Sequence, residues 1–384
     1  MSFWGYPRAD GSVGTRNYVG IIPTVVCATA TAVQISDSVK GTVPFVHHQG
    51  CALTPSDLDL VNRTLTNLGR HPNLAGVILV GLGCEPVDID AVAEGIGESG
   101  KPVEKLVIQE VGGTIATVMQ ASRIARQMVG DAGSAVRQQF DDSALMFGAE
   151  CGGSDTTSGL GSNPAIGAAF DLLIDAGGTG VFSETTEFVG AEHLLARRAV
   201  SPQVGERIID IVTRYERRFL EAGVDMRGTN PTKGNIVGGL TTIDEKSLGA
   251  IAKGGTRPIQ GVYEYGEKVT GKGLYIVDGP GFDAPSLTCL AAAGSNVMFF
   301  STGRGTPLGS PFVPVIKVTA NRTTYERMQD NIDVYVDLEA KADVEHFGRI
   351  LFSEALQVAS GKQTKAELLD QSRYNGICIA GPLA

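Results

Sequence analysis

The residues Gly76-Val77-Ile78-Leu79-Val80 form a short apolar run, and the polar loop Gly81-Leu82-Gly83-Cys84-Glu85 follows at once. In the stretch from Asp57 to Leu68, apolar residues recur every three or four positions, which is typical of a helix with one buried face. Strand-like runs that alternate with such helices predict parallel βα units. Three further runs of this kind lie at residues 18–26, 42–46 and 105–108.

The length of the chain predicts more than one domain. A chain of 384 residues is long enough to build two or three separate cores. A polar segment at 130–143, with little periodicity, separates the first block from a second that begins at Ala144. We therefore expect an α/β fold with doubly wound, mainly parallel sheets in two packed domains, with three as the alternative. The expected limits are 1–138, a flavodoxin- or Rossmann-like domain, and 139–384, a larger catalytic domain with glycine-rich substrate loops.

Composition excludes several classes of function. A formal net charge of -10 argues against nucleic acid or an anionic membrane as the main partner. The first residues do not resemble a signal peptide, and no apolar run reaches the roughly 18 residues that span a bilayer. We expect a cytoplasmic protein. Six cysteines are too few for a disulfide framework in a chain of this length, so thiols in loops are candidate ligands.

Polar side chains follow each predicted strand of the first block. The carboxyl ends of parallel strands meet at one edge of the sheet, where ligands usually bind. A metal or acid-base role is one interpretation; glycine turns that merely start helices are the alternative. Likewise, one histidine of the pair His47-His48 can be a ligand or an acid-base group, or the pair can be one buried and one exposed imidazole. The residues at this edge are Cys27, His47, His48, Cys51, Cys84, Glu85, Gln109 and Glu110.

Cys51, Cys84 and Cys151 are candidate iron ligands. As thiolates they can hold an iron-sulfur cluster or a mononuclear ion that histidine and carboxylates also bind. Spacing does not choose between these sites. The predicted metal ligands are His47, His48, Cys51, Cys84, Glu85 and Cys151.

Three loops of the second block, at 183–187, 238–247 and 302–305, combine glycines with charged or hydroxyl side chains. Glycine loops let backbone amides approach an oxyanion, and lysine or arginine complements a carboxylate. Charged helix ends are the alternative explanation. For Glu187 and Lys246 in particular, surface solvation is as good an explanation as function.

Taken together, these segments resemble the altronate and galactarate dehydratase family, to which sulfolactate sulfo-lyase large subunits also belong. The resemblance runs through nearly the whole chain and rests on many motifs in order. They include Val13-Gly14-Thr15-Arg16-Asn17, His48 to Cys51, Gly81 to Glu85, Gln109-Glu110, Cys151 to Asp155, Glu184 with Glu187, 238–249, Thr302 to Gly305 and Pro314 to Val318.

The resemblance implies a lyase that uses a divalent metal, typically Fe2+ with Mn2+ as an alternative, on a 2-hydroxy carboxylate. A base removes the proton beside the carboxylate, a group leaves from the next carbon, and the enol becomes a 2-oxo acid. The implied catalytic residues are His48, Glu110, Glu187 and Lys246. The implied substrate-binding residues are Arg16, Asn17, Ser154, Asp155, Thr241, Thr242 and Arg304.

The resemblance also implies a partner. Full-length sugar-acid dehydratases of the family begin with a small extra domain of about a hundred residues, an ordinary domain length. This chain begins directly at the Gly5-Tyr6 motif, which predicts the large subunit of a split, oligomeric enzyme with a separate small subunit. Cleavage of (2R)-3-sulfolactate to pyruvate and sulfite is the preferred reaction, and dehydration of altronate or galactarate is the alternative. A non-catalytic metabolite-binding subunit is the hypothesis from another class.

Overall fold

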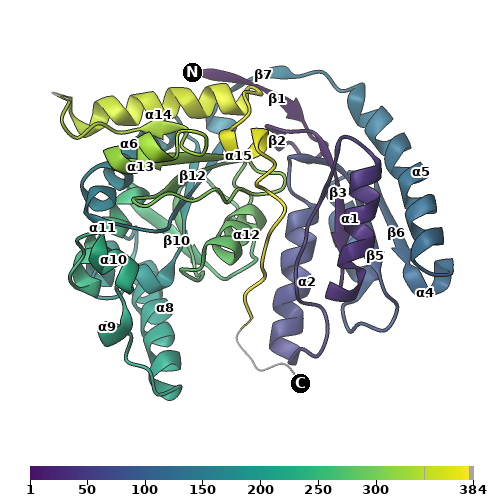
Figure 1. The fold of residues 1–384 in the computed structure, drawn as a ribbon, viewed down its shortest axis with the longest axis horizontal. Helices are drawn as coiled ribbons and strands as arrows, with labels where there is room; N and C mark the ends of the chain where they lie inside the picture. The colour runs from purple at the N-terminus through teal and green to yellow at the C-terminus, as the bar shows by residue number, and fades with distance from the viewer. Residues whose placement is uncertain (341, 380–384) are drawn as a thin grey trace.

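The computed structural model describes residues 1–340 and 342–379 and contains two parallel sheets, each covered by helices on both faces (Figure 1). The first sheet has the strand order β4-β3-β5-β6. Helices α1 and α5 pack on one face, and α2 and α3 pack on the other. The strands are β3 (Tyr18–Pro23), β4 (Thr42–Pro44), β5 (Leu74–Gly81) and β6 (Val103–Val107), and the helices are α1 (Thr29–Ser38), α2 (Pro55–Gly69), α3 (Ile89–Gly97), α4 (Ile108–Val111) and α5 (Thr114–Gly133).

The second sheet has seven parallel strands in the order β10-β11-β9-β8-β12-β13-β14, so β8 lies at its centre. Helices α6 (Asn163–Asp175) and α14 (Val344–Ala359) cover one face, and α12 (Asp283–Ala293) covers the other. The strands are β8 (Met146–Cys151), β9 (Thr179–Phe182), β10 (Ile259–Tyr263), β11 (Gly273–Val277), β12 (Val297–Ser301), β13 (Val315–Thr319) and β14 (Val334–Tyr335).

The remaining helices are shorter or lie outside these layers. The long helix α8 (Pro202–Glu221) packs beside β10, with Ile208, Ile211 and Val212 on its buried face. The others are α7 (Glu192–Arg197), α9 (Met226–Thr229), α10 (Lys233–Val237), α11 (Ile243–Ile251), α13 (Arg322–Arg327) and α15 (Lys365–Leu368). The predicted α/β class with mainly parallel, doubly wound sheets is confirmed.

A third sheet is small and antiparallel, and the sequence did not predict it. The chain begins with β1 (Ser2–Pro7), which pairs with β2 (Val13–Gly14) on one side and β7 (Gln138–Asp141) on the other. Strand β7 starts at residue 138, where we placed the domain boundary. That boundary stays a prediction, because the residues around it form a strand and not a free linker.

A shared apolar core holds the two large sheets together. One buried cluster contains Val61 and Leu65 of α2 together with Leu287 and Leu290 of α12. Helix α12 therefore packs against its own sheet and against α2 of the first unit. The ring of Phe312, which is 2% exposed, lies 6.3 Å from that of Phe45 across the same contact.

The C-terminal segment also crosses between the units, and Figure 1 shows it in yellow running down between them. Tyr374 forms a parallel bridge with Val46 just beyond β4. The Gln49 side chain donates a 3.3 Å hydrogen bond to the carbonyl of Ile377, and the Tyr265 hydroxyl donates to that of Gly376. Within residues 1–340 and 342–379, no helix has the length and apolar content needed to cross a bilayer.

We expect Phe312→Ala to lower the free energy of unfolding by about 3–5 kcal/mol, because it opens a cavity in the core that joins the units. Urea unfolding followed by far-UV circular dichroism measures the change. The control is Phe282→Ala, since Phe282 is 68% exposed and its loss is expected to cost less than about 0.5 kcal/mol. Equal stability of the two variants would show that this contact does not hold the units together.

Candidate active site

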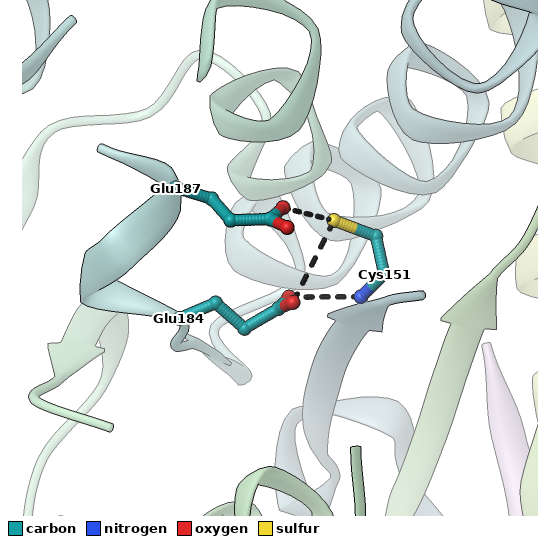
Figure 2. A group of neighbouring side chains, drawn as sticks. All are labelled: Cys151, Glu184 and Glu187. Atoms are coloured by element: carbon teal, nitrogen blue, oxygen red, sulfur yellow. Dashed lines mark hydrogen bonds between the residues drawn. The ribbon is translucent and has the colours of Figure 1, made fainter. Parts of the chain in front are cut away.

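The candidate site lies at the carboxyl ends of two neighbouring central strands, β8 and β9. Strand β8 ends at Cys151, and β9 is followed by Ser183, Glu184 and a 3-10 turn, Thr185–Glu187. Glu184 has a left-handed backbone with φ of 77°, a conformation that costs energy for a residue with a side chain. Figure 2 shows that this turn points the Glu184 and Glu187 carboxylates at the Cys151 sulfur.

Two lysines complete this group. The Cys151 sulfur lies 2.9 Å from Glu187 Oε2 and 3.1 Å from Lys253 Nζ, and the Cys151 amide donates a 2.8 Å bond to Glu184 Oε2. Lys253 forms an ion pair with Glu184, and both side chains are fully buried. Lys246 Nζ lies 2.8 Å from Glu187 Oε1. The five side chains form one continuous buried network, which we call the Cys151 network.

Both lysines come from one helical region. Helix α11 (Ile243–Ile251) continues into the 3-10 turn Ala252–Gly254. Lys246 and Lys253 are seven residues apart, which corresponds to about two helical turns, so they lie on the same face. We predicted roles for Cys151, Glu187 and Lys246 and missed Lys253. Its spacing from Lys246 was the available signal.

Burial and neighbouring charge set the protonation of the network. Burial raises the pKa of Glu184 to about 8. The attraction of Lys253 opposes this shift, and the repulsion of Glu187 adds to it. The pKa of Glu187 is lowered, because Lys246 and Lys253 together outweigh its burial. Burial, followed by repulsion from Glu184 and Glu187, raises the pKa of the Cys151 thiol. Glu187 is therefore the carboxyl best suited to accept a proton near neutral pH.

A further buried carboxyl lies next to the network. Glu150 precedes Cys151 in β8 and is paired in register with Phe300, which packs on the α12 side of the sheet. Neither Glu150 oxygen has a hydrogen-bond partner among the described residues. Burial, then repulsion from Glu184 and Asp283, raises the pKa of Glu150 well above the usual range, so its neutral form is favoured.

A cavity of about 270 Å³ opens beside Lys246. Asp155 is fixed in its wall because it accepts hydrogen bonds from the Ser158 amide at 3.0 Å and from the Asn321 amide group at 2.7 Å. Lys246 lines the cavity and also contacts Glu187, so it links the open space to the buried network. The polar lining residues are Ser154, Asp155, Thr156, Ser158, Asn163, Glu245 and Lys246.

The network includes one set of side chains that fits a metal ion. The ligand atoms of Cys151, Glu184 and Glu187 all lie within 4.8 Å of one another, and it is the only such group of three among the described residues. A thiolate with two carboxylates suits a borderline divalent ion. Burial raises the pKa values of Glu184 and Cys151, and a bound cation would favour the ionised form of both groups.

The structure does not place Cys51 and Cys84 in the Cys151 network. Both are exposed thiols at the edge of the four-stranded sheet, whereas Cys151 is 2% exposed and enclosed by its own network. His47, also predicted as a metal ligand, makes structural contacts. Its Nε2 lies 2.6 Å from the Pro23 carbonyl and its Nδ1 accepts from the Gln49 amide at 3.2 Å, so neither ring nitrogen is free.

Glu85 also has a structural role. Its two carboxylate oxygens accept bonds from the Thr24 hydroxyl and from three backbone amides, those of Leu82, Gly83 and Cys84. The carboxylate therefore builds the loop that carries Cys84. Burial of the His47 ring lowers its pKa to about 4, and His48 beside it is exposed. The alternative of one buried and one exposed imidazole is the one that the structure shows.

Arg16, predicted as a substrate anchor, makes structural contacts with its whole guanidinium group. Its Nε and one Nη2 hydrogen bind Glu367, at 2.6 and 2.8 Å. Its other three N–H groups donate to backbone carbonyls of Thr15, Val358 and Lys362. All five guanidinium donors are used, so none is left for an anion.

Asn17 is also structural, because its amide group bonds to Arg8 and to the Ala132 carbonyl. Thr241 and Thr242 bond Glu245 at the start of α11, so they cap that helix. Arg304 is exposed and keeps one contact, 3.1 Å, to the Gly234 carbonyl. Glu110 is exposed at the end of α4. The roles proposed for Arg304, Glu110 and His48 stay predictions.

Two family profiles match the chain. The one described as D-galactarate dehydratase/altronate hydrolase, second domain, matches residues 5–133, and D-galactarate/altronate dehydratase, C-terminal, matches residues 142–379. The chain belongs to the D-galactarate/altronate dehydratase family. It is therefore an enzyme of the lyase class, as the family resemblance implied.

Named relatives agree with this assignment. The chain is 41% identical to the (2R)-sulfolactate sulfo-lyase subunit beta of Chromohalobacter salexigens, over 97% of this chain and 96% of that protein. It is 36% identical to the altronate dehydratase of Bacillus subtilis, over 96% of this chain and 76% of that protein. It is also 36% identical to the galactarate dehydratase (L-threo-forming) of Escherichia coli, over 99% of this chain and 77% of that protein.

We expect Lys253→Met to destabilise the fold by about 3–5 kcal/mol, because it leaves the buried Glu184 carboxylate without its cation. The double variant Glu184→Gln with Lys253→Met removes both charges and is expected to recover a large part of that loss. Urea unfolding of the wild type, both single variants and the double variant measures the coupling. Additive losses would contradict a direct, buried interaction between these two charges.

Proposed function

We propose that this chain is the large subunit of a lyase that eliminates a group from a 2-hydroxy carboxylate, with (2R)-3-sulfolactate as the substrate. The supporting observation is the share of each relative's length that this chain matches. The similarity spans 96% of the sulfo-lyase subunit beta but only 76% and 77% of two dehydratases. This difference also supports a separate small subunit of about 100 residues, a typical size for a small domain, within an oligomer.

The reaction starts with removal of the proton on C2, beside the carboxylate. The electron pair forms the C2–C3 double bond while the C3–S bond breaks, and its electrons leave with sulfite. The product enol takes up a proton on C3 and releases the proton of its C2 hydroxyl, which gives pyruvate. The elimination needs no oxidant, and every atom of the substrate is recovered in pyruvate and sulfite.

The Cys151 network supplies groups for these steps. Glu187 is the proposed base, because Lys246 and Lys253 keep it ionised in a buried setting. Lys246 is the proposed anchor for a substrate anion, because it lies between Glu187 and the 270 Å³ cavity. The neutral Glu150 is a source of protons close by.

We also propose that the enzyme requires a divalent metal, Fe2+ with Mn2+ as the alternative. When bound, such an ion would supply positive charge that stabilises the enolate formed on proton removal. Cys151, Glu184 and Glu187 are the described residues that would hold it. The lysines would then balance the remaining carboxylate charge.

Dehydration of altronate or galactarate is a second candidate, supported by the identities of 34–36% to dehydratases named for these acids. The chemistry at C2 is the same, and water leaves from C3 in place of sulfite. The two candidates differ in what the cavity beside Lys246 must accept, either a sulfonate or a chain of hydroxyls.

The test uses the chain co-purified with its small subunit under anaerobic conditions and supplied with Fe2+. We expect (2R)-3-sulfolactate to give equal amounts of pyruvate and sulfite, measured separately, and altronate and galactarate to give little 2-oxo acid. A 2-oxo acid from either sugar acid without sulfite would transfer the assignment to a dehydratase. Lack of turnover on all three acids would remove both candidates.

A further inference from the structure

We propose that Cys27, Cys51 and Cys84 hold an iron-sulfur cluster at the carboxyl edge of the four-stranded sheet, separate from the Cys151 network. The expectation from the sequence grouped Cys51 and Cys84 with Cys151. The structure instead places them with Cys27, a residue that we had noted only for its position after the first strand.

The three cysteines follow three adjacent strands. Cys27 comes after β3, Cys51 after β4 and Cys84 after β5, and the order of these strands in the sheet is β4-β3-β5. All three are free and exposed. Free cysteines are usually buried, so three exposed thiols on one edge are unusual.

The loops that carry the thiols are in direct contact. The amide of Val26 donates a 2.9 Å hydrogen bond to the carbonyl of Gln49, which ties the Cys27 turn to the Cys51 loop. A side chain at Gly50 would lie 2.3 Å from the Thr24 carbonyl oxygen, so these backbones touch. The Thr24 hydroxyl also donates a 2.6 Å bond to Glu85, and this joins the first loop to the Cys84 loop.

The Cys84 loop is rigidly built. Glu85 accepts from the amides of Leu82 at 3.0 Å, Gly83 at 2.7 Å and Cys84 itself at 3.1 Å. These bonds fold the backbone around the carboxylate, while the Cys84 thiol is left exposed. The Glu85 carboxylate therefore fixes the position of Cys84 and is not itself proposed as a ligand.

Backbone strain marks the Cys51 loop. Gly50 and Ala52, on either side of Cys51, both have positive φ, 108° and 56°. Ala52 is one of three described residues other than glycine with positive φ, and Glu184 of the Cys151 network is another. Such strain costs of order 1–3 kcal/mol and is retained mainly at functional sites. At Cys51, its effect is to present the thiol at the surface of the edge.

Two helices begin near this edge. Helix α1, of ten residues, begins at Thr29, two positions after Cys27. Helix α5, of twenty residues, begins at Thr114, shortly after α4. Helix α4 contacts the Cys84 loop, because the Gln109 amide donates to the Leu82 carbonyl at 3.1 Å. Helix amino ends carry partial positive charge, which is complementary to an anionic cluster.

A cluster fits the three thiols better than a single ion. Ligands of one ion must lie close together, and the only described group of three whose ligand atoms all lie within 4.8 Å of one another is that of Cys151. A cluster binds each thiolate through a different iron, so it does not require thiols that close. In a cluster of four irons, three thiolates leave one iron without a protein ligand, open to a substrate oxygen at the exposed surface.

The test measures iron and acid-labile sulfide in the chain with its small subunit, after anaerobic reconstitution with Fe2+ and sulfide. We expect bound sulfide with an equal amount of iron, in addition to any single ion held by the Cys151 network, together with a visible charge-transfer absorption and an electron paramagnetic resonance signal on reduction. Serine at Cys27, Cys51 or Cys84 is expected to abolish bound sulfide and the signal. The control is Cys289→Ala, since Cys289 is a buried thiol of α12 and follows no strand of the four-stranded sheet.

Alanine at each position serves as a second substitution, and far-UV circular dichroism checks that every variant is folded. Because the cluster is read directly, its absence would not by itself count against the proposed lyase reaction. The proposal is overturned if the sulfide and the signal survive in the Cys27, Cys51 and Cys84 variants, or if only Cys151→Ser removes them. Lack of bound sulfide after reconstitution, or zinc bound in place of a cluster and lost in the same three variants, also overturns it.

Discussion

The buried ion pair between Lys253 and Glu184 is the interaction on which the rest of the site depends. Both side chains are fully buried, and charges in such a place persist only when each has a partner. The pair joins the 3-10 turn that continues α11 to the segment after β9, where Glu184 has its left-handed backbone. Lys246 lies on the same face of this helical region as Lys253, between Glu187 and the cavity. The same buried charges therefore hold this part of the fold together and supply the groups of the candidate site.

The packing of the two units brings their functional edges towards a common region. Helix α12 and helix α2 share one core, and the C-terminal segment binds to both units through Gln49 and Tyr265. Cys378 and Ile379 of that segment line a cavity of about 130 Å³ with Asp278. The Asp278 side chain accepts a 2.5 Å bond from Thr185, in the turn that carries Glu184 and Glu187. The loop of Cys51 and the Cys151 network are thus connected through the same segment.

Much of the fold could be predicted from the sequence, because buried parallel strands are apolar and stand between amphipathic helices. The strands at 18–26, 42–46, 76–80 and 105–108 were all present, within a few residues. Helix α12 was missed because its sequence is apolar on every side, as its position between two layers requires, so it shows no helical period. The site was harder to predict. Arg16 and Glu85 looked like ligands, but their partners, Glu367 and the amides of their own loop, cannot be recognised from spacing alone. Lys253 gained its role only when the fold brought it to Glu184.

The central claim is that the Cys151 network removes the proton from the substrate, and the most direct measurement is kcat/KM for elimination by Glu187→Gln. Glutamine keeps the shape of the side chain and cannot accept the proton. The account predicts a loss of roughly 10²–10⁴-fold relative to the wild type, the usual contribution of a general base, with an unchanged circular dichroism spectrum. Activity within a few-fold of the wild type would contradict the account, because it would place the base outside this network.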